Sequence, residues 1–181
     1  MNDDIQFLKD FQSELKTQEN DGQASPRYWS IMDYKWEVTE EGYEDRASLF
    51  FPDTCERVEL DEYVKDVLSG EIEHYLDEEQ LEELKEMQES GWYSTNEFVD
   101  FIKEHIDDDC YFIYEKEVSF IAWNTLFFTK TEAKQHLENN RHHYSDKAHT
   151  FAMTAWRAPK MERLMKILET FDWDKVMSQF D

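Results

Sequence analysis

The chain has 181 residues and a formal net charge of −24 at pH 7, from 43 acidic and 19 basic side chains. Its length allows one moderate domain or two small ones, and its 40% apolar and 15% aromatic content excludes an intrinsically disordered chain. A protein this acidic repels nucleic acids and anionic membranes and attracts basic surfaces, so we expect no direct binding to nucleic acid or membrane.

In the N-terminal part, apolar residues at helical spacing predict a helix over residues 3–17 and another over 58–69 that ends at Gly70. Between them, residues 31–39 ("IMDYKWEVT") alternate apolar and polar side chains, which is typical of a half-buried strand. Four side chains would share its buried face: Met32, Tyr34, Trp36 and Val38. Residues 39–57 favour neither helix nor strand.

A strongly acidic helix is predicted over residues 77–90. Leu81, Leu84 and Met87 stand at helical spacing and would form its buried stripe. Gly91 is placed to end the helix, because glycine adopts the left-handed conformation that helix ends require.

The segment "STNEFVDFIKEHI" at 94–106 predicts the next helix, because Ser94 and Glu97 have the spacing of a capping box. After it, "CYFIY" and "VSFIAWNTLFF" are rich in aromatic and β-branched residues. They predict two neighbouring strands that the charged segment "EKE" at 115–117 joins.

In the C-terminal part, Thr129 and Glu132 repeat the capping-box spacing and predict a helix that runs to about residue 138. The segment "HTFAMTAW" predicts an extended stretch. Pro159 suits the first turn of a helix over "PKMERLMKILETF", and a short final turn or helix follows.

The acidic residues are concentrated in the first three-fifths of the chain. Residues 1–110 hold 33 acidic and 9 basic side chains, whereas residues 111–181 hold 10 of each. We therefore predict a small mixed α+β fold with an acidic, mainly helical interaction region over 1–110. A neutral strand–helix–strand–helix module would follow over 111–181.

The cellular setting is predicted from the cysteines and the apolar segments. Cys55 and Cys110 form neither a metal-type cluster nor a disulfide framework, which favours a reducing compartment. The N-terminus lacks the basic start and apolar run of a signal peptide. No stretch approaches eighteen apolar residues, so we expect a cytoplasmic protein without a membrane-spanning helix.

The candidate binding surface is the stretch 71–90, which carries nine acidic residues and one lysine. Glu78, Glu82 and Glu86 recur every four residues, and rows of carboxylates at this spacing can substitute for a nucleic-acid backbone in a Lys/Arg groove. The competing interpretation is a solvated acidic face. The candidate partner-binding residues are Glu71, Glu73, Asp77, Glu78, Glu79, Glu82, Glu83, Glu86, Glu89, Trp92, Tyr93, Asp107, Asp108 and Asp109.

The sequence contains little that indicates an enzyme. Four of the six histidines lie within 136–149, but their spacing matches no zinc motif, so helix-end packing and hydrogen bonding explain them better. No phosphate-binding or nucleophile motif occurs, and a magnesium nuclease would need a basic surface to hold its polyanionic substrate. We predict no enzyme, no cofactor and no metal, with a metal-dependent enzyme as the remaining third alternative.

Residues 127–168 carry the one resemblance to known proteins. Their "FFT" strand end, "EAKQHLENN" helix, "HHYS" turn and "AWRAPKMERL" segment resemble a module at the C-terminus of small phage-encoded accessory proteins. The module covers about a quarter of the chain. The resemblance implies phage origin and no activity, and the acidic region shows no such resemblance.

Taken together, these features resemble in type the anti-CRISPR proteins and the anti-restriction DNA mimics, which are small, acidic and without catalytic motifs. The resulting hypothesis is a phage-encoded inhibitor in the host cytoplasm that binds a basic nucleic-acid-binding protein, a Cas effector nuclease. Its acidic surface would block nucleic-acid binding. The alternatives are an anti-restriction DNA mimic and a non-enzymatic accessory protein that binds its partner through an apolar patch.

Overall fold

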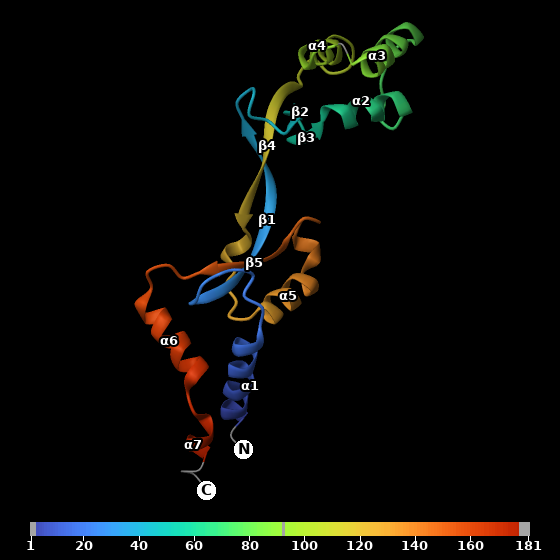
Figure 1. Ribbon diagram of the computed structural model, residues 1–181. Helices are drawn as coiled ribbons and strands as arrows, with labels where there is room; N and C mark the ends of the chain where they lie inside the picture. Colours follow the sequence, from blue (N-terminus) through green and yellow to red (C-terminus); the bar gives the residue numbers. More distant parts are fainter. Residues whose placement is uncertain (1–2, 92, 178–181) are drawn as a thin grey trace. The chain divides into compact units, whose positions relative to one another are not determined.

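The computed structural model describes residues 3–91 and 93–177, and it confirms the predicted mixed α+β fold (Figure 1). The chain forms two compact units. Unit 1 consists of the described residues up to Lys35 and from Ser119 onward, and unit 2 is Trp36–Val118. The N-terminal helix therefore belongs to the same unit as the C-terminal segments, and unit 2 is inserted between them in the chain.

Five strands of the described residues form one sheet in the order β3-β2-β4-β1-β5. Their bounds are β1 Arg27–Thr39, β2 Arg46–Phe51, β3 Glu56–Glu59, β4 Tyr111–Ile121 and β5 His149–Thr154. Both unit boundaries fall inside strands, one within β1 and one within β4. The residues left open at 39–57 thus supply β2 and the first half of β3, whose Val58 and Glu59 lie within the helix predicted over 58–69.

Unit 1 pairs β1 with β5 in antiparallel fashion, with Trp29 opposite Ala152. Its helices are α1 Asp3–Thr17, α5 Lys130–Asn139, α6 Pro159–Thr170 and α7 Trp173–Met177, with short 3₁₀ turns η1 Ala122–Asn124 and η2 Arg141–His143. Its core is small and alanine-rich, consisting of Trp29, Ile31, Ala122, Ala133, Ala148 and Ala152.

Unit 2 pairs β2 with both β3 and β4 and carries α2 Leu60–Ser69, α3 Glu78–Ser90 and α4 Thr95–His105. Its core joins all three helices to the sheet through Leu49, Leu60, Tyr63, Val64, Val67, Leu84, Met87, Val99, Phe101, Ile102 and Cys110. The predicted helices over this region are confirmed. The glycines predicted to end α2 and α3 are their C-caps, with φ of 79° and 61°.

The predicted inward face of β1 holds over residues 34–37, where Trp36 is partly buried between the exposed Lys35 and Glu37, but it is wrong at 31–33 and at Val38. Ile31 and Asp33 are buried, whereas Val38 is 58% exposed and Tyr34 is only partly buried. Asp33 can be buried because its carboxylate accepts hydrogen bonds from the backbone N–H of Tyr34 and from the backbone N–H and hydroxyl of Ser145. Its polarity is thereby satisfied inside the protein, which the alternating pattern does not reveal.

The predicted pair of strands joined by "EKE" is also wrong, because β4 runs unbroken from Tyr111 to Ile121. Glu115 is fully buried and lies directly opposite Arg46 of β2. Both Arg46 and Arg57 bind its carboxylate, at 2.7 and 3.0 Å, and Ser48 donates a hydrogen bond of 2.7 Å. These partners allow a charge to occupy the middle of a strand.

No helix in the described part of the chain combines the length and the apolar character needed to cross a membrane.

Candidate protein-binding surface on the acidic helix

Helix α3 has a well-defined beginning and end. The Asp77 carboxylate accepts the backbone N–H of Gln80, and the Gln80 side chain accepts the backbone N–H of Asp77, both at 2.9 Å. This reciprocal capping box satisfies two otherwise unpaired donors, and Gly91 ends the helix in the left-handed conformation. Asp77, a predicted partner-binding residue, therefore has a structural role in positioning the helix.

Six glutamates lie on the solvent side of α3. At 100° per residue they fall within an arc of roughly 140° opposite the buried Leu84 and Met87, and all six are exposed. Lys85 lies at the edge of this arc. We call the six residues the acidic face: Glu78, Glu79, Glu82, Glu83, Glu86 and Glu89.

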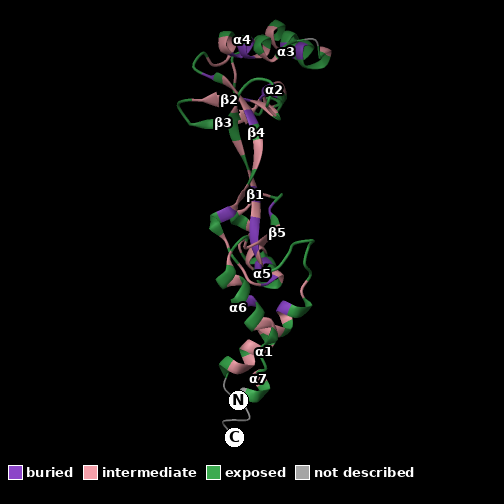
Figure 2. Ribbon diagram, turned by 60° about the vertical axis from the view of Figure 1, so that its left-hand side comes forward, coloured by how far each residue is buried: buried purple, intermediate pink, exposed green. Residues whose placement is uncertain are grey.

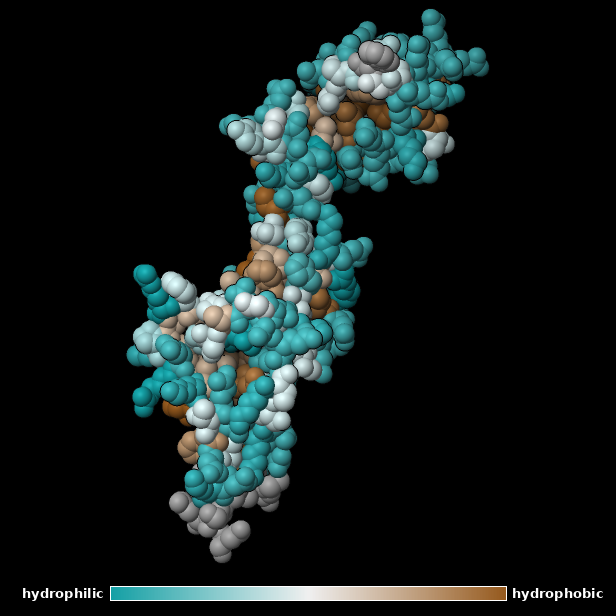
Figure 3. Space-filling view, in the orientation of Figure 1, coloured by the Kyte–Doolittle hydropathy of each residue, from teal (hydrophilic) through white to brown (hydrophobic). Residues whose placement is uncertain are grey.

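Figures 2 and 3 show the same division of α3 into two sides. In Figure 2 only a small part of α3 is buried and the rest of the helix is largely exposed. In Figure 3 hydrophilic residues cover its outer side, at the upper right, and hydrophobic residues gather toward α2. The acidic face is thus open to a partner.

The charges of the acidic face are not neutralised within the protein. Neither the six glutamates nor Lys85 forms an ion pair with any residue in the described ranges 3–91 and 93–177. The last turn of α3 contains no basic residue, and Glu89 lies there, where the helix dipole disfavours negative charge. This arrangement costs helix stability.

The axial spacing of these charges is close to that of a DNA strand. From Glu78 to Glu89 the helix rises about 16 Å, so six carboxylates stand on average about 3.3 Å apart along the axis. A single strand of B-DNA carries one phosphate per about 3.4 Å of helix axis. The acidic face can therefore present charge to a Lys/Arg groove at a density similar to one DNA strand.

The acidic triplet after α4 lies near the beginning of α3, because the Gln80 amide contacts His105 Nδ1 at 3.2 Å. Within the triplet, the Asp107 carboxylate accepts the backbone N–H groups of Asp109 and Cys110, at 3.0 and 3.1 Å. Asp107 thus stabilises the turn into β4, whereas Asp108 and Asp109 are exposed. Those two can extend the acidic face.

Exposed residues also flank both ends of α3. Glu71 and Glu73 are exposed in the segment before it. Tyr75, in the same segment, is 97% exposed, and Tyr93, after the helix, is 39% exposed. Tyrosines are frequent anchors in interfaces. The sequence analysis missed Tyr75, whose signal is an aromatic side chain among acidic residues between two helices. The predicted Trp92 lies outside the described residues.

Beside the acidic face, a cavity of about 230 Å³ opens between α2, α3 and α4. It is lined by Leu60, Asp61, Val64, Met87, Gln88, Gly91, Tyr93, Thr95 and Phe98. The surface around α3 therefore combines a charged row with a small depression that both polar and apolar residues line.

Almost all of the net charge belongs to unit 2, which holds 28 acidic and 6 basic residues, a net charge of −22. Two of those six cations, Arg46 and Arg57, are occupied by Glu115. Burial raises the pKa of the Glu115 carboxyl, but hydrogen bonds from Ser48 and the two arginines outweigh it, and the pKa lies below its ordinary value. Few cations therefore remain to screen the acidic face.

The histidine-rich segment belongs to unit 1. His136 Nε2 lies 2.8 Å from the Tyr144 hydroxyl, and the His142 and His143 rings contact each other. Within residues 3–91 and 93–177, no three His, Cys, Asp or Glu side chains are grouped as a metal site requires.

No protein-family model, curated protein or solved structure matches the chain. The resemblance of residues 127–168 to a phage module stays a prediction.

Proposed function

We propose that the chain is a non-enzymatic, phage-encoded inhibitor that binds the basic nucleic-acid-binding surface of a host defence nuclease through its acidic face. An anti-CRISPR protein that acts on a Cas effector in the host cytoplasm is the form we favour. An anti-restriction DNA mimic would use the same surface. The observation that carries the proposal is the row of six exposed, unpaired glutamates on α3.

The physical basis is electrostatic competition. Carboxylates spaced like phosphates would occupy the Lys/Arg side chains that otherwise hold nucleic acid, and complementary charge would make association fast at low salt. Tyr75 and Tyr93 would add apolar contact at the two ends of α3. Such binding weakens as salt rises, because ions screen the exposed charges.

The test is a competition experiment. Guide-loaded Cas effectors and, separately, a restriction enzyme are mixed with fluorescent target duplex, and the chain is titrated at low and high salt. Release of the duplex at low salt, reduced at high salt, is the expected result. The double variant Glu82→Lys/Glu86→Lys should lose this activity.

A matched control changes the same charge elsewhere. Glu138 and Glu169 lie near the C-terminal ends of α5 and α6 in unit 1, where lysine is compatible with the helix dipole. Glu138→Lys/Glu169→Lys should inhibit like the parent protein. Equal activity of both double variants would refute binding through α3.

One observation supports a different mode of binding. The cavity between α2, α3 and α4 and the exposed Tyr75 offer apolar contact independent of charge. An accessory protein that binds through this patch would hold its partner at 1 M salt and would be insensitive to excess duplex DNA.

A further inference from the structure

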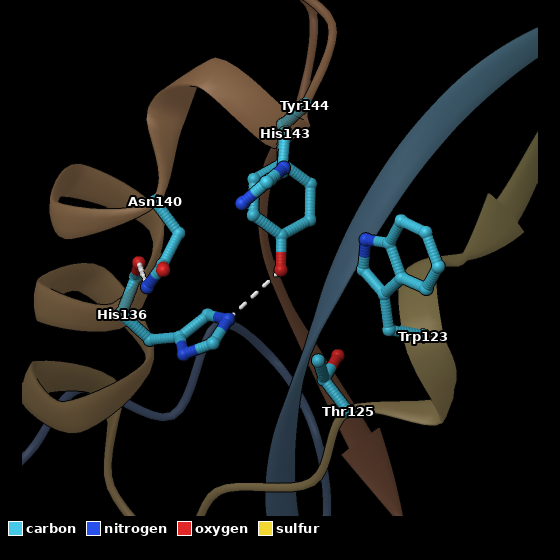
Figure 4. A pocket seen from close by; sticks show the side chains of 6 residues that line it. All are labelled: Trp123, Thr125, His136, Asn140, His143 and Tyr144. Carbon is cyan, nitrogen blue, oxygen red and sulfur yellow. Dashed lines mark hydrogen bonds between the residues drawn. The ribbon is translucent and has the colours of Figure 1, made fainter.

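Unit 1 contains a cavity of about 460 Å³ that the proposed function does not use (Figure 4). Its volume lies within the usual range for small-molecule sites. Six side chains from η1, α5, η2 and their flanking residues line it: Trp123, Thr125, His136, Asn140, His143 and Tyr144.

Trp123 forms one wall in an unfavourable conformation. Its φ of 54° and ψ of 20° are left-handed, and the next residue, Asn124, has φ of 52°. Left-handed geometry is disfavoured for any residue with a Cβ and is exceptional for a bulky one. The indole is 74% exposed and contacts no other aromatic ring within the described residues, so burial does not offset the strain. Strain of this kind is common where a ligand is held.

The opposite wall is rigid. The Tyr144 hydroxyl bonds His136 Nε2 at 2.8 Å, and the His136 ring packs on Phe127 with centroids 5.0 Å apart. Figure 4 shows the Tyr144 hydroxyl directed into the cavity toward His136, with Trp123 on the far side. The cavity is therefore preformed between aromatic surfaces, which suits a flat ring.

Two polar groups can form hydrogen bonds with the edge of such a ring. Asn140 Nδ2 donates to the backbone carbonyl of His136 at 2.8 Å, which leaves its Oδ1 as an acceptor. Thr125 Oγ1 accepts the backbone N–H of Ile31 at 2.9 Å, which leaves its hydroxyl proton to donate. A donor and an acceptor beside an aromatic wall match the edge of a nucleobase.

The unit that holds the cavity carries a net charge of only about −2, unlike unit 2. Residues 119–160 hold six basic and three acidic side chains besides four histidines. Arg141, His142 and His143 form η2, and His143 lies in the cavity lining. The Arg141 guanidinium is bonded to the backbone carbonyls of Asp146 and Ala148, so His143 is the η2 side chain that can donate a hydrogen bond to a phosphate in the cavity.

We propose that the cavity binds a free nucleotide, with its base stacked on Trp123 and its phosphate toward η2. The overall charge of −24 disfavours a long polyanion here, so a mononucleotide fits better than a nucleic-acid strand. This site is separate from the acidic face, and its test involves no basic partner protein.

The test is isothermal titration of the full chain with AMP, GMP, CMP and UMP. Adenosine, inorganic phosphate and a 5′-phosphorylated tetranucleotide serve as comparison probes. We expect at least one mononucleotide to bind, and to bind more tightly than adenosine or phosphate. Absence of mononucleotide binding, or tighter binding of the tetranucleotide, would overturn the proposal.

Two tryptophan variants locate the site. Trp123→Ala should weaken binding roughly ten-fold or more, because stacking on an aromatic side chain supplies a large part of base affinity. Trp156→Ala is the matched control, since Trp156 is 79% exposed in the same unit but does not line the cavity. Circular dichroism checks that the variants are folded. The proposed site is refuted if Trp123→Ala binds the nucleotide as tightly as the parent. It is also refuted if Trp156→Ala loses as much affinity as Trp123→Ala.

Discussion

Neutralising two residues at the centre of the acidic face should stabilise the protein. The acidic face contains three like-charge pairs at i,i+4 and three at i,i+3, and five of these six pairs include Glu82 or Glu86. Each such pair costs about 0.2–0.5 kcal/mol in an isolated helix. Glutamine has nearly the helix propensity of glutamate, so Glu82→Gln/Glu86→Gln should gain about 1–2.5 kcal/mol at low salt.

Urea denaturation of the full chain measures this gain. With a typical slope of about 1–3 kcal/mol per M, the midpoint should rise by roughly 0.3–2.5 M in 10 mM salt. Most of the rise should vanish in 1 M salt, where the screening length is about 3 Å. Glu138→Gln/Glu169→Gln is the control, because Lys134 and Lys166 stand three or four residues away and no gain is expected.

The same variant should bind the proposed basic partner less tightly. Loss of two interfacial ion pairs, at about 0.5–1 kcal/mol each, corresponds to a roughly 5–30-fold weaker Kd. A gain in stability together with a loss of binding is the pattern of a charged functional surface. An unchanged urea midpoint at low salt would refute the reasoning that these glutamates repel one another without compensation.

The remaining predictions concern the two buried carboxylates. Glu115→Gln should cost about 3 kcal/mol by urea denaturation, the low end for a broken buried pair, because Arg57 is 42% exposed and water screens it. The pKa of Glu115 lies below its ordinary value of 4.5, so its stabilising effect is present above that pH and is lost as pH falls through the folded-state pKa. The stability difference between the parent and Glu115→Gln should therefore shrink below about pH 4.5, and a constant difference down to pH 3 would contradict this sign. Burial opposes ionisation of Asp33, but hydrogen bonds led by the Ser145 hydroxyl keep its pKa below 3.8; Ser145→Ala should raise that pKa, as NMR titration can measure, and cost about 1.5–3 kcal/mol.

Helix boundaries could be predicted from the sequence because their signals are local. The Ser94 hydroxyl and the Glu97 carboxylate form the expected capping box, and Pro159 occupies the first turn of α6. At Thr129, the structure shows one bond of the expected box, from the backbone N–H of Glu132 to the threonine hydroxyl. Each of these interactions joins residues within one helical turn.

The sheet could not be predicted in the same way, because its decisive contacts are distant in sequence. Glu115 is buried through Arg46 and Arg57, which lie 69 and 58 residues away. Asp33 is buried through Ser145, 112 residues away. From the sequence alone, a charged residue inside an apolar segment predicts a turn or an exposed face. Only the distant partner, which the sequence does not reveal, explains why the charged residue is buried within a strand.

The candidate site was predictable in composition but not in detail. The periodicity of α3 indicates which side is acidic, whereas the missing ion pairs and the structural roles of Asp77 and Asp107 depend on neighbouring segments. The left-handed conformation of Trp123 has no signal in the sequence, since no glycine marks that turn.

The two ends of α3 differ in how well their charges suit the helix, and this difference helps to explain why the helix is so acidic. Its N-terminus follows the rules of helix stability, with the Asp77–Gln80 capping box and with Glu78 and Glu79 in the first turn. Its C-terminus breaks them, because Glu89 lies at the negative end of the dipole and the last turn contains no basic residue. Solubility needs a net charge of only about 2–8 in magnitude for a small domain, whereas unit 2 carries −22 and unit 1 about −2. The charge of α3 thus lowers helix stability and exceeds what solubility requires, and this excess is confined to unit 2. Such a departure from the rules of helix stability is typical of a functional surface and supports the proposal that α3 binds a basic surface.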